Sequence, residues 1–234
     1  RIGASVARGL TKFVGRTREQ EALKEACEKA GSGGGQVVGI VGEAGVGKSR
    51  LLLEFRAGLP EDQNTYLEGR CVQYGSAMAY LPILGILRSY FDIKDGEPET
   101  TVNQRMKEKI LHLDENLKHL ILPFQEILSL KVENKDYLQI DSQQRKMMAF
   151  DAVRDLFVRE SHNKPLVLVI EDLHWIDKTS EKLLDHLIGS LPNTRILLIL
   201  LYRPEYTHPW ENHSFYGRIG LDQLSAHASM ALVQ

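Results

Sequence analysis

The sequence of 234 residues lacks long apolar runs, has only two cysteines and carries no excess of positive charge. No run approaches the ~18 apolar residues of a membrane-spanning helix, and the amino-terminal residues lack a signal peptide's apolar core. Cys27 and Cys71 have no metal-binding spacing and we expect no disulfide between them, which is typical of a reducing cytoplasm. The net charge of −2 argues against a nucleic-acid partner. We therefore expect a cytoplasmic protein without membrane contact.

The remaining composition, with 43% hydrophobic and 26% charged residues, is that of an ordinary globular domain. The eight histidines are scattered, and we expect no metal site even where His208 and His213 lie close together. The sequence begins at Arg1 and stops at Gln234 within a helical pattern. We therefore expect it to be part of a longer protein.

Residues 42–49 fit the pattern G-x-x-x-x-G-K-[ST], which is typical of phosphate-binding loops. A strand-forming stretch at 37–41 precedes them, and a helix-forming stretch at 50–57 follows. A strand, a glycine loop and a helix start in this order aim backbone N–H groups and the positive end of a helix dipole at a polyphosphate. The sequence therefore predicts a nucleoside triphosphate site.

Two side chains at the end of this loop have specific expected roles. We expect the Lys48 ammonium to reach the β- and γ-phosphates and the Ser49 hydroxyl to ligate Mg²⁺. The glycines let the backbone curl around the phosphates without Cβ clashes. The residues expected to bind nucleotide here are Gly42, Glu43, Ala44, Gly45, Val46, Gly47, Lys48, Ser49 and Arg50. The structural alternative is a glycine-rich turn without a ligand.

A second chemical element, Glu171-Asp172, follows the apolar run at 166–170. Carboxylates at the carboxyl end of a parallel strand lie in the crevice where open α/β sheets bind ligands. One of the two would hold Mg²⁺, directly or through water, and the other would orient the attacking water. The alternative is that one of these acids only caps the following turn.

The apolar runs at 166–170 and 196–201 are continuous rather than alternating, which is typical of a parallel sheet covered on both faces. A helix-forming segment between them favours a right-handed β-α-β crossover. Further strands are expected at 65–69 and 219–221. The predicted fold is an α/β three-layer sandwich with a mostly parallel central sheet.

Helices are expected outside the sheet as well. One begins near Thr17, which would form a capping box with Gln20. Another begins at Ser142. The stretch at about 93–140 mixes amphipathic pieces with polar breaks, and we interpret it as a helical insertion without chemistry.

The chain divides into three predicted segments. Residues 1–12 form a linker and residues 13–221 form the nucleotide-binding core. Residues 222–234 begin a truncated lid or carboxy-terminal helical region, where Ser225 would cap a helix.

Five short segments occur in an order that resembles a known family. They are Phe13-Val14-Gly15-Arg16, the loop at 42–49, Gly69-Arg70-Cys71, the run EDLHWID at 171–177, and Tyr202-Arg203-Pro204-Glu205. Over about residues 10–234 they resemble the AAA-type ATPase domain of the STAND class of signalling NTPases. The acidic-His-Trp-x-Asp signature makes this resemblance more specific than a phosphate loop alone. The resemblance implies a P-loop NTPase fold of the ASCE, AAA-like type.

The resemblance also implies an adenine pocket. Phe13, Val14 and Gly15 would line it with backbone and apolar contacts. Arg16 would brace that turn, or form a plain surface salt bridge.

For catalysis, the resemblance implies roles for Lys48 and for three residues after the central strands. Glu171 would take the Mg²⁺-binding position with Ser49, and Asp172 the water-activating one. Many relatives carry Asp at the first of these positions, so both acids remain metal and catalytic candidates. Arg203 matches the sensor arginine that reads the γ-phosphate.

Neighbouring residues of the same motifs have supporting roles in this resemblance. His174 and Trp175 would be packing and hydrogen-bonding supports, and Asp177 would cap the next helix. Leu201 stands where relatives often have Thr, which removes one possible hydroxyl contact.

The leading interpretation is a regulatory ATPase of slow turnover that uses ATP and Mg²⁺. Its nucleotide state would switch effector domains in the same longer chain. The resemblance points to bacterial multidomain regulators, so a nucleotide cyclase upstream or helical repeats downstream are expected partners. The alternatives are an ATP-binding scaffold that hardly hydrolyses, a nucleic-acid-remodelling AAA ATPase and, less favoured, a small-molecule kinase.

Overall fold

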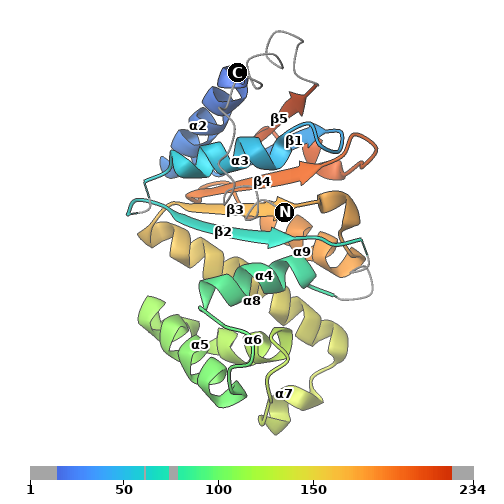
Figure 1. Ribbon diagram of the computed structural model, residues 1–234. Helices are drawn as coiled ribbons and strands as arrows, with labels where there is room; N and C mark the ends of the chain where they lie inside the picture. Colours follow the sequence, from blue (N-terminus) through green and yellow to red (C-terminus); the bar gives the residue numbers. More distant parts are fainter. Residues whose placement is uncertain (1–14, 61, 74–78, 223–234) are drawn as a thin grey trace.

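The computed structural model describes residues 15–60, 62–73 and 79–222, and one parallel sheet runs through them (Figure 1). Its strands are β1 (Gln36–Gly42), β2 (Thr65–Arg70), β3 (Leu166–Glu171), β4 (Ile196–Tyr202) and β5 (Tyr216–Leu221). Their order across the sheet is β2-β3-β4-β1-β5, and every neighbouring pair is parallel. The predicted α/β fold with a mostly parallel sheet is confirmed.

The central strands β3 and β4 are buried along their whole length. Their continuous Leu, Ile and Val side chains suit strands that are covered on both faces. β4 lies between β1 and β3 and pairs with both. The carboxyl ends of β1 and β3 therefore lie at the same edge of the sheet, roughly 9.5 Å apart across one intervening strand.

Helices α2 (Thr17–Gly31) and α3 (Lys48–Ala57) cover one face of the sheet (Figure 1). Leu23 of α2 and Leu51 and Phe55 of α3 are buried in the cluster that includes Val38 of β1 and Ile199 of β4. Because α3 follows the loop after β1 directly, this packing fixes the direction of its amino terminus at the carboxyl edge of the sheet.

Helices α4 (Leu81–Tyr90), α8 (Ser142–Asn163) and α9 (Lys178–Ile188) cover the other face (Figure 1). Leu87, Phe157 and Leu184 contribute one buried side chain from each of them to the larger core cluster. With helices on both faces of the sheet, the predicted three-layer arrangement is present.

The stretch interpreted as an insertion is helical and forms a further layer outside α4 and α8 (Figure 1). Its elements are α5 (Glu99–Leu113), the 3-10 helix η1 (Glu115–Leu120), α6 (Ile121–Ile127) and α7 (Lys135–Gln139). α5, η1 and α6 pack on one another and on α8. The buried side chains of Met106 and Phe124 join this layer to the larger core cluster.

The start of α2 differs from the prediction. Thr17 is already helical, Arg16 is the N-cap residue, and no side chain caps the helix. The predicted capping box of Thr17 and Gln20 is therefore wrong, because a side chain caps from the position before the first helical residue. The Arg16 guanidinium instead donates to Glu19 Oε1 at 2.9 Å and to the carbonyl oxygen of Asp222. Arg16 thus joins the start of α2 to the residue after β5.

Several expectations fall outside the described residues, namely the linker at 1–12, Phe13, Val14 and Ser225. Cys27 and Cys71 are both free thiols. In the part of the chain that the structure describes, no helix combines the length and the apolar character needed to cross a membrane.

Candidate functional site

The loop between β1 and α3 has the curled backbone that its glycines predict. Gly45 and Gly47 have φ angles of 80° and 106°, in the left-handed region that favours glycine. Gly47 is the N-cap of α3, and its carbonyl accepts a hydrogen bond from the Leu51 amide at 2.9 Å. The helix starts at Lys48, earlier than the stretch at 50–57 that we expected. The N–H groups of its first turn therefore begin directly after the loop.

Gly42, the first residue of the motif, is required by packing. A Cβ atom there would lie 2.7 Å from the carbonyl oxygen of Leu221 and 2.8 Å from the Val46 side chain. These distances leave no room for a larger residue where β5 runs beside the end of β1. The middle of the loop is exposed, at Glu43, Ala44 and Gly45.

The Lys48 ammonium folds over its own loop. Its Nζ donates hydrogen bonds to the carbonyl oxygens of Gly42 and Glu43, the second at 2.9 Å. Partial burial lowers the pKa of Lys48; Asp172 opposes this effect, and Arg203 adds to it. Carbonyl oxygens are weaker partners for an ammonium than a charged phosphate would be. The position of Lys48 therefore fits a phosphate ligand.

Ser49 and Glu171 meet across the carboxyl edge of the sheet. The Ser49 hydroxyl donates to Glu171 Oε2 at 2.8 Å, and the Glu171 residue is only 6% exposed. Burial and a hydrogen bond with Glu68 of β2 raise the pKa of Glu171 to about 7, whereas the Ser49 hydrogen bond lowers it. The buried carboxyl group is therefore a proton-binding group near neutral pH, and a metal ion that binds it must displace that proton.

The oxygens of Ser49 and Glu171 fit Mg²⁺, which prefers oxygen ligands. Among the described residues, no group of three or more His, Cys, Asp or Glu side chains could hold a metal by itself. In nucleotide sites, however, Mg²⁺ needs only one or two protein ligands, because substrate phosphates and water complete its shell. The pair is sufficient for a site of that kind.

Asp172 has a different partner. Its backbone is left-handed, with φ 54° and ψ 38°, and its side chain makes no capping bond to the 3-10 helix η2 (Leu173–Trp175). Its Oδ2 accepts two hydrogen bonds from Arg70, at 3.0 Å from Nε and 2.8 Å from Nη2. Arg70 ends β2, which pairs with β3. Asp172 therefore does not merely cap the turn, and the two adjacent acids are separately engaged.

Arg203 follows β4 and lies at the same edge. Its Nη1 is 3.8 Å from Glu205 Oε1. The Arg203 charge lowers the pKa of both Lys48 and His174, after the larger effect of burial on each. The ends of β1, β3 and β4 thus bring together one group of polar side chains, which we call the edge cluster: Lys48, Asp172, His174, Arg203 and Glu205.

Of the expected supports, Asp177 behaves as predicted. Its Oδ1 accepts hydrogen bonds from the Thr179 and Ser180 amides, both at 2.9 Å, at the start of α9. His174 packs against Trp175, with 5.1 Å between ring centroids. The hydrogen bonds expected of His174 are missing, since neither ring nitrogen has a partner among the described residues.

The predicted adenine residues are described only in part. Phe13 and Val14 lie outside the described residues. Gly15 is exposed and has a φ of 78°. The hydrogen bond from Arg16 to the Asp222 carbonyl places this turn beside the end of β5, which is the neighbour of β1.

Sequence reasoning gave no role to three residues of this region, Glu68, Arg70 and Glu205, although Arg70 and Glu205 lie in two of the motif segments. Glu68 lies on the strand expected at 65–69 and Arg70 is the residue after it, but their contacts arise because β2 lies beside β3. Strand order is a tertiary property that no local motif in the sequence fixes. Arg50, which we expected in the nucleotide set, pairs with Glu54 along α3.

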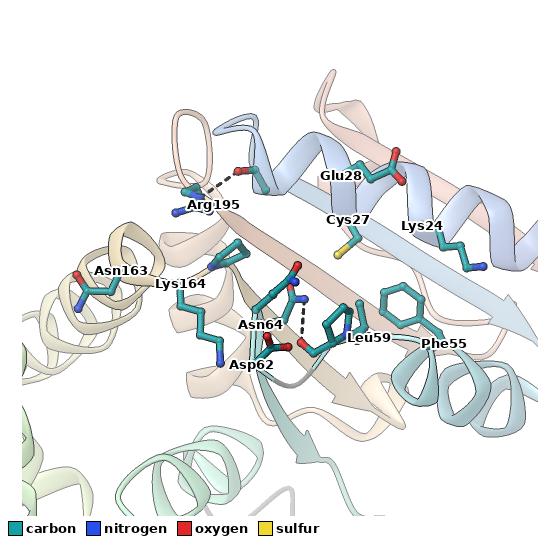
Figure 2. Close-up of a pocket in the computed structure, with 15 residues that line it drawn as sticks. Lys24, Cys27, Glu28, Phe55, Leu59, Asp62, Asn64, Asn163, Lys164 and Arg195 are labelled. Carbon is teal, nitrogen blue, oxygen red and sulfur yellow. Dashed lines mark hydrogen bonds between the residues drawn. The ribbon is translucent and has the colours of Figure 1, made fainter.

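A separate hollow of about 690 Å³ lies at the opposite edge of the sheet (Figure 2). Its lining includes Lys24 and Cys27 of α2, Asn64 before β2 and Arg195 before β4. Arg195 Nε donates to the Gly31 carbonyl oxygen at 3.0 Å. Open α/β sheets bind ligands outside the carboxyl ends of their strands, and this hollow lies at the amino ends. We therefore do not assign a nucleotide to it.

Comparison with known proteins gives a match to a curated protein over most of this chain and weak likenesses to solved structures. An uncharacterized protein of Rhizobium meliloti (strain 1021) is 25% identical over 219 residues, which is 92% of this chain and 21% of the relative. The chain therefore spans about a fifth of the length of that relative.

Among solved structures, a STAND protein with a tetratricopeptide repeat sensor from Pyrococcus horikoshii matches with a TM-score of 0.43 and 13% identity, over 94% of this chain and 25% of that one. The structure of Drosophila ORC bound to GC-rich DNA and Cdc6 matches with a TM-score of 0.38 and 12% identity, over 91% of this chain and 64% of that one. Neither likeness is strong enough to carry an argument.

The family comparison is more decisive. Residues 12–200 match the sequence model of the AAA ATPase domain, which is most of the chain. This match covers the phosphate loop and the two acids, and it confirms the AAA-type resemblance that the motifs gave. The chain belongs to the AAA ATPase domain family.

Proposed function

We propose that this domain binds ATP with Mg²⁺, hydrolyses it slowly and acts as a nucleotide-dependent switch within a larger protein. The observation that carries the proposal is the 2.8 Å hydrogen bond from the Ser49 hydroxyl to Glu171 Oε2, just after the curled loop. It brings a hydroxyl and a buried carboxyl group together where backbone N–H groups and a helix amino terminus favour phosphate.

The described residues divide the work of phosphoryl transfer among them. Lys48 and the loop amides would hold the phosphates, and Ser49 and Glu171 would hold Mg²⁺. The bound metal ion would neutralise charge on the phosphates. Asp172 would orient the attacking water, and Arg203 would contact the terminal phosphate. Phosphoryl transfer requires positioning and charge compensation, which these groups supply without covalent chemistry.

The pairing of Asp172 with Arg70 supports a slow rate. Asp172 Oδ2 accepts two hydrogen bonds from Arg70, at 3.0 and 2.8 Å. Asp172 must leave this partner, at least in part, before it can accept a hydrogen bond from water. The same pairing favours the second candidate, an ATP-binding scaffold that hardly hydrolyses. Single-turnover measurements of phosphate release distinguish the two functions.

The length of the relative and the STAND resemblance support the switch role. The chain spans about a fifth of its curated relative, so the parent protein has room for effector domains. A nucleotide cyclase on one side, or helical repeats on the other, fits this proposal. Ordering of Arg203 and its neighbours by a terminal phosphate, followed by release after hydrolysis, would change what those domains contact.

Calorimetry of nucleotide binding tests the proposal. Lys48→Ala should weaken ATP and ADP binding by about ten- to a hundredfold, because a hydrogen bond to a charged group contributes about 1.5–3 kcal/mol. Lys29→Ala is the matched control, since Lys29 is an exposed lysine on α2 that pairs with Glu25. Affinity unchanged by Lys48→Ala would remove Lys48 from the site and contradict the proposal.

A further inference from the structure

His174 is a partly buried residue whose two ring nitrogens make no hydrogen bond among the described residues. Both Nδ1 and Nε2 are buried, and neither has a partner among the described residues. A neutral imidazole carries one N–H donor and one acceptor, and buried polar groups in native proteins are nearly always paired. An imidazole that keeps both nitrogens unpaired costs free energy, and a functional role explains why such a group is retained.

The surroundings of His174 point to phosphate. The charges that act on its ring are those of Arg203, Asp172, Glu205 and Lys48, from the ends of three neighbouring strands. The His174 and Trp175 ring centroids are 5.1 Å apart. Trp175 belongs to the same 3-10 turn as His174. The Trp175 amide donates a hydrogen bond to the Asp172 carbonyl oxygen at 2.9 Å, which closes this turn. The turn therefore holds His174 within the edge cluster.

We propose that His174 donates a hydrogen bond to the terminal phosphate of bound ATP and so allows the domain to discriminate ATP from ADP. This inference rests on the proposed function of the same site. In that proposed function, the loop amides and Lys48 hold the phosphates, Arg203 contacts the terminal phosphate and Asp172 orients the water that attacks it. His174 is grouped with these two, and a phosphate oxygen would pair its N–H group.

His208 provides a matched contrast. It is the other histidine with a buried, unpaired ring nitrogen among the described residues, at Nδ1. Its Nε2, however, lies 3.3 Å from the Tyr216 hydroxyl, and its ring stacks on Trp210 at 4.9 Å. The charges that act on it belong to Glu211, Arg218 and Glu181, and none of these is in the edge cluster. His208 is therefore part of an aromatic packing cluster.

The test compares the affinities for ATP and ADP, measured by calorimetry with Mg²⁺ on the full protein. His174→Ala should lower the affinity for ATP about ten- to a hundredfold relative to ADP, the range expected for a hydrogen bond to a charged group. His174→Gln retains an N–H donor and should keep much of the discrimination. His208→Gln, the control, should leave the ratio of the two affinities unchanged.

A second readout does not depend on affinity. In the wild-type protein, the ¹⁵N NMR signals of the His174 ring should shift when a non-hydrolysable ATP analogue is added and should shift less with ADP. A merely structural role predicts lower thermal stability in His174→Ala with an unchanged ratio of affinities. That result, or an equal decrease in the affinities for ATP and ADP, overturns the inference.

Lys48→Ala separates this inference from the proposed function. Suppose that Lys48→Ala weakens the binding of both ATP and ADP, whereas His174→Ala keeps the wild-type ratio of ATP affinity to ADP affinity. Then only the role of His174 is wrong. If Lys48→Ala binds both nucleotides as the wild type does, the proposed function is itself wrong and the inference falls with it.

Discussion

At the scale of single residues, adjacent acids differ here through their partners rather than through their own chemistry. Glu171 is buried and bonded to Ser49, whereas Asp172 pairs with Arg70 closer to the surface. Glu171 is therefore the better placed to hold a metal ion with the loop. Asp172 can exchange its arginine partner for water at modest cost, because the Arg70 side chain is 60% exposed.

Arg70→Ala should therefore increase the single-turnover rate of ATP hydrolysis without changing ATP affinity. An exposed ion pair contributes about 0.2–1 kcal/mol, so the increase should be at most about fivefold. Rapid-quench measurement of phosphate formation gives the rate. The control is the same substitution in an Asp172→Asn background, which should show slow hydrolysis and no increase. A slower Arg70→Ala enzyme would mean that Arg70 assists the reaction rather than restrains Asp172.

At the scale of elements, the position of β2 depends on one glycine. A Cβ atom on Gly69 would lie 2.1 Å from the carbonyl oxygen of Pro82 and 3.1 Å from the Ile86 side chain, both in α4. Gly69 lies between Glu68, which contacts Glu171, and Arg70, which contacts Asp172. The close approach of α4 to β2 therefore also sets where these two side chains lie.

Gly69→Ala should lower the free energy of unfolding by about 1–3 kcal/mol, the usual cost of forcing extra volume into a packed contact. Gly85→Ala on the facing helix is the matched control. Its added Cβ would meet only ordinary contacts, the nearest at 3.7 Å, and alanine favours a helix by up to about 1 kcal/mol over glycine. In urea denaturation, Gly85→Ala should be the most stable, the wild type intermediate and Gly69→Ala the least stable. Equal stability of the two variants would contradict this account of the contact.

The elements also explain which expectations the sequence could support. The strands at 166–170 and 196–201 were predictable because continuous apolar runs are typical of buried parallel strands. The loop at 42–49 was predictable because its glycines and its lysine form a local sequence motif, and the glycines allow the curled backbone without help from distant parts of the chain. The Arg70 contact with Asp172 was not, because it requires β2 to lie beside β3.

Local signals failed in a second way at the start of α2. Thr17 and Gln20 fit a capping box, but Arg16 occupies the N-cap and its guanidinium bonds to the carbonyl of Asp222 after β5. A long-range hydrogen bond therefore sets where this helix begins. No spacing along the sequence carries that information.

At the scale of the whole molecule, the site joins the two faces of the sheet. Ser49 belongs to α3, which packs in one core cluster, and Glu171 leads into the turn that packs in the other. The protonation state of Glu171 should therefore affect the unfolding of the entire domain. Its pKa is raised from an ordinary value of 4.5 to about 7, chiefly by burial, so the folded state binds this proton more tightly than the unfolded state does.

The sign of the effect follows from that difference. The stability that the protonated carboxyl contributes is complete below about pH 4.5, decreases as the pH rises towards 7 and is lost above it. Glu171→Gln is neutral at every pH and avoids this loss. Without nucleotide and Mg²⁺, its free energy of unfolding relative to wild type should therefore be higher at pH 8 than at pH 5, as measured by urea denaturation.

The control for this experiment is Glu25→Gln on α2, the same substitution at a glutamate whose side chain is 68% exposed. At pH 8, Mg²⁺ and ATP should stabilise the wild-type protein more than Glu171→Gln, because a ligand that binds only the folded state stabilises it more the tighter it binds. Wild-type protein can offer a carboxylate to the metal ion, whereas Glu171→Gln cannot. If Glu171→Gln gained as much stability from Mg²⁺ and ATP as the wild type, Glu171 would not be a metal ligand, and the metal site would have to be sought at Asp172.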